Sequence, residues 1–247
     1  MGMTMLNEFI EYLIAQIGQP YLWGGQHTKL MRSNYKEVIA RREEKEENRR
    51  LVEQYCEKLF DDGYEVLYAY DCSGLGCYWI YNLKHLWKCD VTADTMMKRC
   101  ELREDLPKKG WWVFKYNGKK ATHIGYMIDD QYLVEAKGRK YGVVRTKFKK
   151  KDWDKWGIPN VFRDDIINPD PDLKPQKGKM IKVKGFVRVR EGNGKKFDPI
   201  PPTPSNCLLP YRGQAKEDPY WYETVWQGQY GFISSNPKYT EIVEAEI

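Results

Sequence analysis

A change of apolar periodicity divides the first two thirds of this 247-residue chain into a helical part and a strand-forming part. Apolar residues recur at helical spacing over residues 4 to 17 and again over residues 72 to 87. Four short strand-like runs follow at 112–114, 123–128, 132–136 and 142–146, separated by the turn signals Asn117-Gly118 and Asp129-Asp130. Helices followed by antiparallel strands predict an α+β domain.

Two segments between the predicted helices have a different character. Residues 20 to 25 form a turn-rich aromatic loop, in which Gly24 and Gly25 permit close approach of the backbone. Residues 33 to 60 mix basic and acidic side chains at pairing distances, which predicts one long polar helix. Apolar positions such as Ile39 and Val52 can dock this helix onto the body, so it is either a solvated insertion or a lid.

A proline-rich segment from residue 164 to 179 predicts a linker between two domains. The strand-like runs beyond it, at 181–183, 186–190, 221–226 and 230–233, are broken by turns at 192–194 and by prolines at 199–204, as expected of a small all-β barrel. The predicted division is a first domain of residues 1–166 with a helical insertion at about 30–66, a linker at 167–178 and a second domain at 179–247.

Composition excludes several classes of function. The net charge is only +6, and basic residues alternate with acidic ones, which does not favour a nucleic-acid partner. The sequence contains no apolar run of about 18 residues for insertion into a membrane. Six cysteines without a C-x-x-C pair, together with three histidines, do not favour a metal site or a disulfide framework. The high aromatic content suits a peptide or sugar surface as well as a core.

Cys72 is the candidate nucleophile, because it lies where a predicted helix begins and a helix N-terminus can stabilise a thiolate. Gly74 and Gly76 keep its surroundings open, and backbone N–H groups of this turn can stabilise an oxyanion. The local pattern is equally compatible with a buried structural cysteine.

His123 and Glu135 can complete a catalytic set with Cys72. His123 shares one face of a predicted strand with Gly125 and Met127, and we expect its ring to point toward the helix that carries Cys72. Glu135, on the next predicted strand, can accept the other ring N–H and orient the imidazole. A thiol, its base and an orienting carboxylate indicate hydrolase chemistry.

Five runs, PYLWGG, YDCSGL, LPKKGWWVF, THIGYMI and YLVEAKG, occur in this order, and residues 5 to 165 resemble the NlpC family of bacterial cell-wall cysteine peptidases. The resemblance implies a papain-like core of helices packed on an antiparallel sheet. It also implies cleavage of peptidoglycan stem peptides, typically between γ-D-glutamate and the diamino acid. Cys72 would be the nucleophile, His123 the base and Glu135 the third polar residue, a position that is often histidine in this family.

The same resemblance implies that Tyr21, Asp71 and Ser73 contact the L-Ala end of the stem peptide. An acidic side chain beside a free amine makes physical sense, although Asp71 can equally cap the helix. The segment between Tyr21 and Cys72 is longer than is usual in the family. The last 70 or so residues resemble a bacterial SH3-like domain, in which Val187 to Gly194 would form the opening strand and turn. That domain would bind cell wall, shape the substrate groove or serve a purely structural role.

The leading hypothesis is a monomeric stem-peptide endopeptidase that acts on peptidoglycan or muropeptides and needs no metal or organic cofactor. An N-acetylmuramoyl-L-alanine amidase or an acyltransferase can use the same Cys and His residues, and a non-catalytic wall-binding protein is a third hypothesis. Residues 1 to 12 carry Glu8 and Glu11 and show no signal peptide. We therefore expect synthesis in the cytoplasm with release as a phage or prophage lysin, recycling of imported fragments, or a secreted protein whose leader has been removed.

Overall fold

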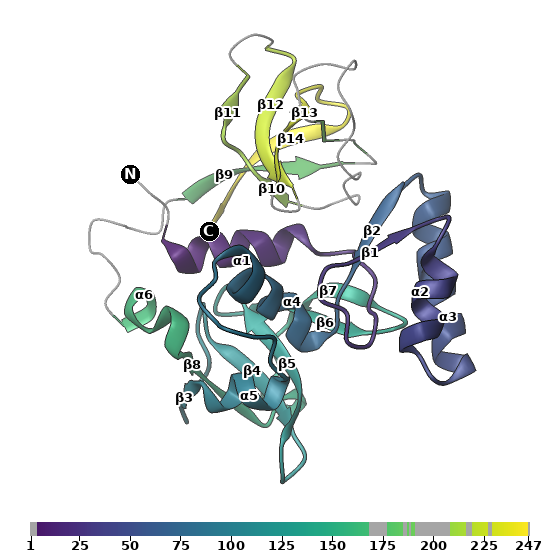
Figure 1. The fold of residues 1–247 in the computed structure, drawn as a ribbon. Helices are drawn as coiled ribbons and strands as arrows, with labels where there is room; N and C mark the ends of the chain where they lie inside the picture. The colour runs from purple at the N-terminus through teal and green to yellow at the C-terminus, as the bar shows by residue number, and fades with distance from the viewer. Residues whose placement is uncertain are drawn as a thin grey trace.

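The computed structural model describes residues 4–167, 177–184, 187, 189–190, 208–215, 219–226 and 229–246. Its largest element is a six-stranded antiparallel sheet with the strand order β3-β8-β4-β5-β6-β7 (Figure 1). The strands are β3 (Cys100–Leu102), β4 (Trp112–Tyr116), β5 (Ala121–Met127), β6 (Tyr132–Gly138), β7 (Gly142–Lys147) and β8 (Lys155–Pro159). The four predicted strand runs correspond to β4, β5, β6 and β7, whereas β3 and β8 were not predicted.

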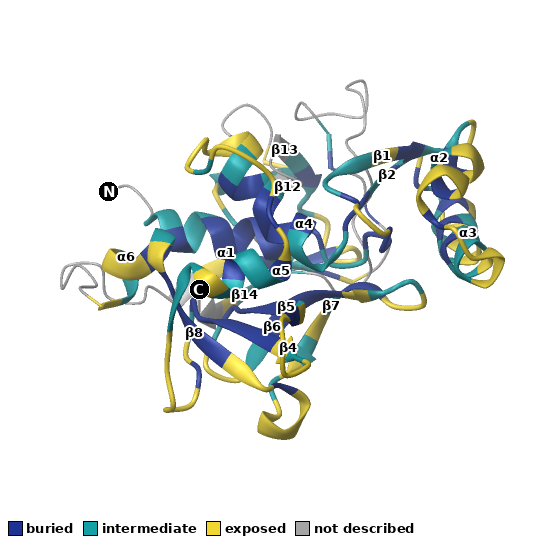
Figure 2. Ribbon diagram, turned by 60° about the horizontal axis from the view of Figure 1, so that its bottom comes forward, coloured by how far each residue is buried: buried dark blue, intermediate teal, exposed yellow. Residues whose placement is uncertain are grey.

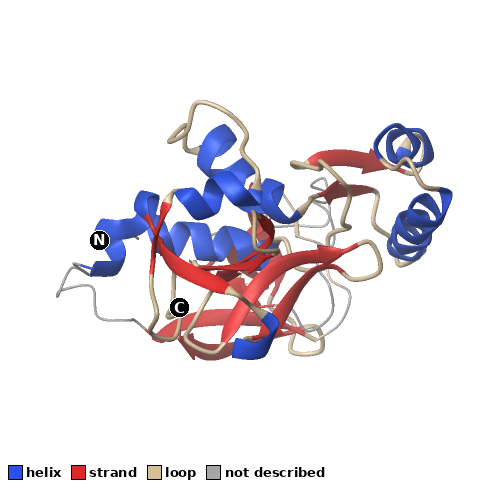
Figure 3. Ribbon diagram, turned by 90° about the horizontal axis from the view of Figure 1, so that it is seen from below, coloured by secondary structure: helices blue, strands red, loops and turns tan. Residues whose placement is uncertain are grey.

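The helices of this part lie mainly on one side of the large sheet (Figure 3). The side chain of Thr4 caps the first helix by accepting the N–H of Asn7 at 3.2 Å, which explains why the apolar repeat starts there. The helix predicted over 72–87 begins at Cys72, changes to a π-helical turn after six residues and ends at Leu83. The elements are α1 (Met5–Ala15), α4 (Cys72–Cys77), the π-helical turn η1 (Tyr78–Leu83), α5 (Ala93–Lys98), the 3₁₀ turns η2 (Lys150–Asp152) and η3 (Asn160–Phe162), and α6 (Arg163–Ile167).

Alternation along the strands divides the core between the two faces of the sheet. Ile124 and Tyr126 of β5 pack with Phe9 of α1 and Leu75 of α4. Met127 of the same strand belongs to a second cluster, on the other face, with Trp153 and other residues after β7. Both clusters are buried, and Figure 2 shows the central strands and the inner side of α1 in dark blue.

Residues 28–69 form an extension of two strands and two helices, which we call the arm. It lies beyond the end of the large sheet, on the right of Figure 1. Strands β1 (Thr28–Met31) and β2 (Val66–Ala69) pair antiparallel at its base, with Thr28 opposite Ala69. They carry α2 (Tyr35–Arg42) and α3 (Glu46–Asp61). The arm has its own apolar cluster, which includes Leu30, Ile39, Val52, Cys56, Phe60 and Leu67.

The prediction of one continuous helix over residues 33–60 is wrong, because the chain leaves the helical conformation after Arg42. Glu43 is extended, with φ −105° and ψ 105°. Arg49 stabilises the break, since its Nε donates to the Glu43 carbonyl at 2.6 Å and its Nη2 to the Glu44 carbonyl at 3.0 Å. A run of alternating charges carries no sign of this break.

The C-terminal part contains two three-stranded sheets, β10-β9-β14 and β11-β12-β13, and neither closes into a barrel within the residues described. The SH3-like barrel therefore remains a prediction. Of the run predicted at 186–190, Val187 and Val189 are buried with the C-terminal strands, and Arg190 forms an isolated bridge with Phe232. The linker residues 168–176, the turn at 192–194 and the prolines at 199–204 lie outside the described residues. The strands are β9 (Lys177–Val183), β10 (Leu208–Pro210), β11 (Gly213–Gln214), β12 (Trp221–Trp226), β13 (Gln229–Ser234) and β14 (Thr240–Glu246).

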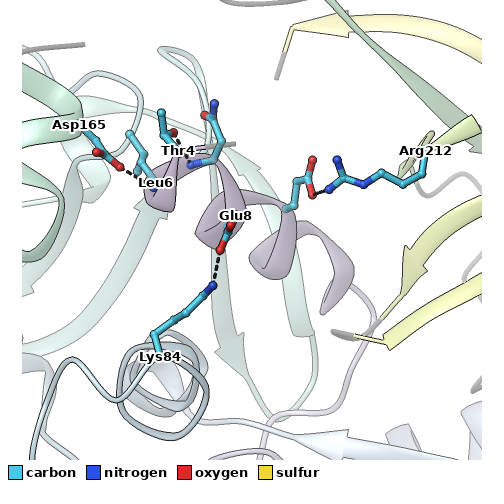
Figure 4. Close-up of polar contacts among 8 residues, drawn as sticks. Thr4, Leu6, Glu8, Lys84, Asp165 and Arg212 are labelled. Atoms are coloured by element: carbon cyan, nitrogen blue, oxygen red, sulfur yellow. Dashed lines mark hydrogen bonds and ion pairs between the residues drawn. The ribbon is translucent and has the colours of Figure 1, made fainter. Parts of the chain in front are cut away.

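Helix α1 contacts both parts of the chain (Figure 4). Asp165 accepts the Leu6 N–H at 2.8 Å, and Glu8 pairs with Lys84. Toward the other side, Glu11 pairs with Arg212 at 2.6 Å, and Ala15 joins the apolar cluster of the C-terminal strands. No helix in the described part of the chain is long and apolar enough to cross a membrane.

Candidate active site

Cys72 is the first residue of α4, as the sequence predicts. The Asp71 side chain caps this helix by accepting the Gly74 N–H at 2.6 Å. On the opposite side, the Tyr126 hydroxyl donates to the Cys72 carbonyl at 2.9 Å and thereby ties the start of the helix to β5. The half-buried thiol is therefore held by a cap on one side and by a strand on the other.

The surroundings of the thiol favour its protonated form. Burial, and next the charge of Asp71, raise the pKa of the Cys72 thiol to about 12, although the N–H groups of Ile124, Ser73 and Cys72 itself oppose this shift. The expectation that the helix start lowers the thiol pKa does not hold for this arrangement, because desolvation outweighs the N–H groups. The thiol needs a base.

His123 and Glu135 form the hydrogen bond that the sequence predicts. Nε2 of His123 lies 2.7 Å from Oε2 of Glu135, and the hydroxyl of Thr146 donates to Oε1 at 2.7 Å. Burial alone would raise the pKa of Glu135, but the hydrogen bonds from His123 and Thr146 outweigh it and hold this pKa below its usual value. Trp153 stacks on the imidazole, with 5.6 Å between ring centroids. Because Nε2 is engaged, Nδ1 is the ring nitrogen left for the thiol proton.

The ring of His123 stacks on Trp153, whose cluster lies on the face of β5 that also carries Met127. The direction of the ring relative to Cys72 stays a prediction. Helix α4 covers the opposite face, because its apolar Leu75 packs with Ile124. Alternation shows which residues lie together but not which face a helix will cover.

The thiol lies beside the backbone of Ile124, the residue that follows His123, at a point where β5 and β6 are not paired. The two strands pair only at Tyr126–Val134 and Met127–Leu133. Beyond these pairs, the Ile124 N–H is free to approach the sulfur of Cys72. The thiol is thus next to the backbone of the residue that follows His123, without a hydrogen bond between Cys72 and His123 among the described residues.

Tyr21, Asp71 and Ser73 surround Cys72. The Ser73 hydroxyl donates to Asp71 Oδ1 at 3.2 Å, so both side chains belong to the helix cap. Burial raises the pKa of Asp71 in spite of these bonds. Tyr21 is buried and forms an isolated bridge with Tyr70, and its pKa is raised by burial and then by the nearby Cys72 and Asp71. The structure brings the three residues together, and their contact with substrate remains a prediction.

The sequence did not predict three further residues that support the site. Thr146, Trp153 and Tyr126 hold Glu135, His123 and Cys72, respectively. Thr146 and Trp153 reach the site only through strand pairing and packing, so no local signal marks them. No group of three or more His, Cys, Asp or Glu side chains in the described residues is arranged to hold a metal ion.

A cysteine at a helix start, together with a histidine that is bound to a carboxylate on an adjacent strand, is a set of groups that cysteine hydrolases use. Residues 18–159, more than half of the chain, match the NlpC/P60 family. The chain belongs to this family.

Similar solved structures include the P60 domain of an antigen from M. avium subspecies paratuberculosis, with a TM-score of 0.39 and 16% identity over 64% of this chain and 98% of that domain. The peptidoglycan hydrolase RipB from Mycobacterium tuberculosis gives a TM-score of 0.40 and 16% identity, covering 65% of this chain and 68% of RipB. Ly7917 gives a TM-score of 0.34 and 10% identity, covering 98% and 99% of the two chains. A search of the curated proteins found no match.

Proposed function

We propose that this protein is a cysteine peptidase that hydrolyses an amide bond in the stem peptide of peptidoglycan. Membership of the NlpC/P60 family supports the reaction class. The observation that carries the proposal is the 2.7 Å hydrogen bond between His123 and the buried Glu135, on strands beside the thiol of Cys72. A buried carboxylate fixes the ring and stabilises the imidazolium that forms when His123 accepts a proton.

Proton transfer and attack are coupled in this mechanism, because the resting thiol is protonated. Nδ1 of His123 accepts the thiol proton as the sulfur attacks the amide carbonyl. The N–H groups of Cys72 and Ser73, which lie beside the sulfur, would stabilise the oxyanion. His123 then protonates the leaving amine, and water hydrolyses the thioester in a second step with the same base.

For the bond, we propose cleavage after γ-D-glutamate, with the free L-Ala amine of the stem bound near Tyr21, Asp71 and Ser73. A buried carboxylate such as Asp71 suits an ammonium group. The C-terminal strands would form an SH3-like wall-binding unit, and release as a lysin would bring the enzyme to its substrate.

The first prediction is that Cys72→Ala abolishes cleavage of purified muropeptides, with a loss of about 10³-fold or more because the nucleophile is absent. Cys72→Ser should lose nearly as much, since His123 would then have to activate a far weaker acid. The matched control is Cys89→Ser, which changes an exposed cysteine and should keep full activity. Full activity of Cys72→Ala would end the proposal.

Mass spectrometry of the products distinguishes the bonds. Substrates with a free and with an acetylated L-Ala amine are digested in parallel. We expect L-Ala-γ-D-Glu to be released from the free amine and much slower cleavage after acetylation. Sacculi, in which L-Ala is still joined to muramic acid, are digested as a third substrate. Cleavage between muramic acid and L-Ala would instead identify an amidase, and wall binding without any product would identify a non-catalytic protein.

A further inference from the structure

The carboxylate of Glu43 joins three segments that are far apart in the sequence. It lies at the break between α2 and α3 in the arm and is 2% exposed. Its Oε2 accepts from Nε and Nη2 of Arg139, in the turn after β6, at 2.9 and 2.8 Å. Its Oε1 accepts the backbone N–H of Trp23 at 3.1 Å. One buried side chain thus holds the arm, the loop 21–25 and the β6–β7 turn together.

Arg139 connects this ion pair to the candidate substrate site. Its guanidinium lies over the ring of Tyr21, 5.4 Å from the centroid, which is a favourable cation–π distance. Tyr21 in turn lies close enough to Cys72 and Asp71 for their charges to affect its titration. Tyr21 also forms a bridge with Tyr70, two residues before Cys72. Contacts therefore run from Glu43 through Arg139 and Tyr21 to the segment that carries the thiol.

Further contacts keep the same loop in place. The Arg42 side chain donates to the Gly24 carbonyl. The Gly25 carbonyl accepts the Asp71 N–H at 2.8 Å, so this loop is bonded directly to the residue before Cys72. A loop bonded at both the arm and the start of α4 can position a substrate more accurately than a free loop.

We propose that Glu43 is a positioning residue of the peptidase site, which fixes Arg139 and the loop 21–25 so that Tyr21 can receive the amino-terminal end of the stem peptide. This inference rests on the function proposed above and deepens it. It gives the arm a role in substrate binding without any contact between Glu43 and the reacting atoms. Loss of the Glu43 charge should then weaken substrate binding while the chemistry of Cys72 and His123 continues.

The test is steady-state kinetics of the full chain with a muropeptide that has a free L-Ala amine. For Glu43→Gln we expect KM to rise about ten-fold while kcat stays within about two-fold, the pattern that follows loss of uniform binding. Glu37→Gln is the matched control, because Glu37 forms an exposed ion pair with Arg41 on α2, and it should match the unmodified chain. Glu43→Asp keeps the charge and should restore part of the affinity.

The double variant Glu43→Gln/Arg139→Gln addresses folding, since it leaves no buried charge without a partner. We expect its KM to be no worse than that of either single variant, because the two residues act as one unit. The inference is overturned if Glu43→Gln leaves KM unchanged, or if it lowers kcat only in proportion to the fraction of unfolded protein. Either result leaves the proposed function intact. Absence of cleavage by both the unmodified chain and Glu37→Gln overturns the proposed function and this inference with it.

Discussion

Burial raises the pKa of most ionisable side chains around Cys72. It raises the pKa of Cys72, Asp71 and Tyr21, and Glu135 is the exception because His123 and Thr146 stabilise its ionised form. A protonated thiol is protected from adventitious oxidation, since the thiolate is the reactive species. The nucleophile would thus be generated only when a substrate carbonyl is in place.

His27 provides a prediction at the same scale. Its ring stacks between Tyr68 and Tyr78, at centroid distances of 3.9 and 4.1 Å, and Nδ1 lies 2.5 Å from the Tyr70 hydroxyl. Burial lowers the pKa of His27 from 6.5 to about 4. The unfolded chain therefore binds this proton first as the pH falls. The stabilising effect of neutral His27 is complete above pH 6.5 and is lost between pH 6.5 and about 4, by at most about 3 kcal/mol.

Urea unfolding at pH 7 and at pH 4.5 measures this loss. His27→Phe keeps a stacking ring but does not titrate, so its free energy of unfolding should fall less between the two pH values than that of the unmodified chain. Carboxyl groups titrate in both proteins, so their contribution to the loss of stability cancels in the comparison. An equal loss in both would contradict the assignment.

At the scale of elements, strongly periodic segments were predictable and long-range pairings were not. The helix capped by Thr4 and the strands β4 to β7 follow from local pattern and turn residues. Strands β3 and β8 are three and five residues long and pair with each other across a long stretch of chain, so no local signal marks them. Strand β14 was not predicted, because three glutamates interrupt its apolar residues Ile242, Val243 and Ala245.

The same distinction applies to the candidate site. The sequence predicted the partnership of His123 with Glu135, because adjacent strands joined by a tight turn bring nearby residues together. It could not predict the contacts of Glu43 with Arg139, since these residues are 96 positions apart. The side of the sheet covered by α4 also depended on helix packing, which alternation does not specify.

Close contact between α4 and the loop 21–25 gives a prediction for Gly74→Ala. A Cβ at position 74 would lie 2.1 Å from the Gly25 carbonyl oxygen, a backbone atom that also accepts the Asp71 N–H. We expect a loss of about 1–3 kcal/mol in the free energy of unfolding, in spite of the better helix propensity of alanine.

Ser73→Ala is the control in the same helical turn, because it removes one hydroxyl bond to Asp71 and introduces no clash. It should cost about 0.5–1.5 kcal/mol. Urea unfolding of both variants measures the difference, and a smaller loss for Gly74→Ala than for Ser73→Ala would show that the loop moves aside without cost.

For the whole molecule, α1 is the element shared by the large sheet and the C-terminal strands (Figure 4). Its Glu11 is buried beside Arg212, with 9% of the side chain exposed, whereas 36% of the Glu8 side chain is exposed in its pair with Lys84. Burial raises the pKa of Glu11, and Arg212 partly offsets this effect. The two ion pairs on one helix therefore differ in how much each carboxylate depends on its partner.

Arg212→Ala should lower the free energy of unfolding by about 1–3 kcal/mol, because it leaves a buried carboxylate unpaired. Glu8→Gln is the control and should cost no more than about 1 kcal/mol, as for other solvent-accessible pairs. In Arg212→Ala/Glu11→Gln, removal of the remaining charge should recover part of the loss. Differential scanning calorimetry measures all three, and equal effects of Arg212→Ala and Glu8→Gln would exclude a special role for the buried pair.

The pairing of Thr28 with Ala69 brings the two ends of the arm side by side. A segment that leaves and rejoins the fold at neighbouring positions can be excised and replaced by a tight hairpin without redirecting the remaining backbone. Excision would nevertheless remove Glu43 and leave Arg139 without its counter-charge. A shortened form of this enzyme therefore requires a second change at position 139, so that the arm and a single arginine in a distant turn are inherited or engineered together.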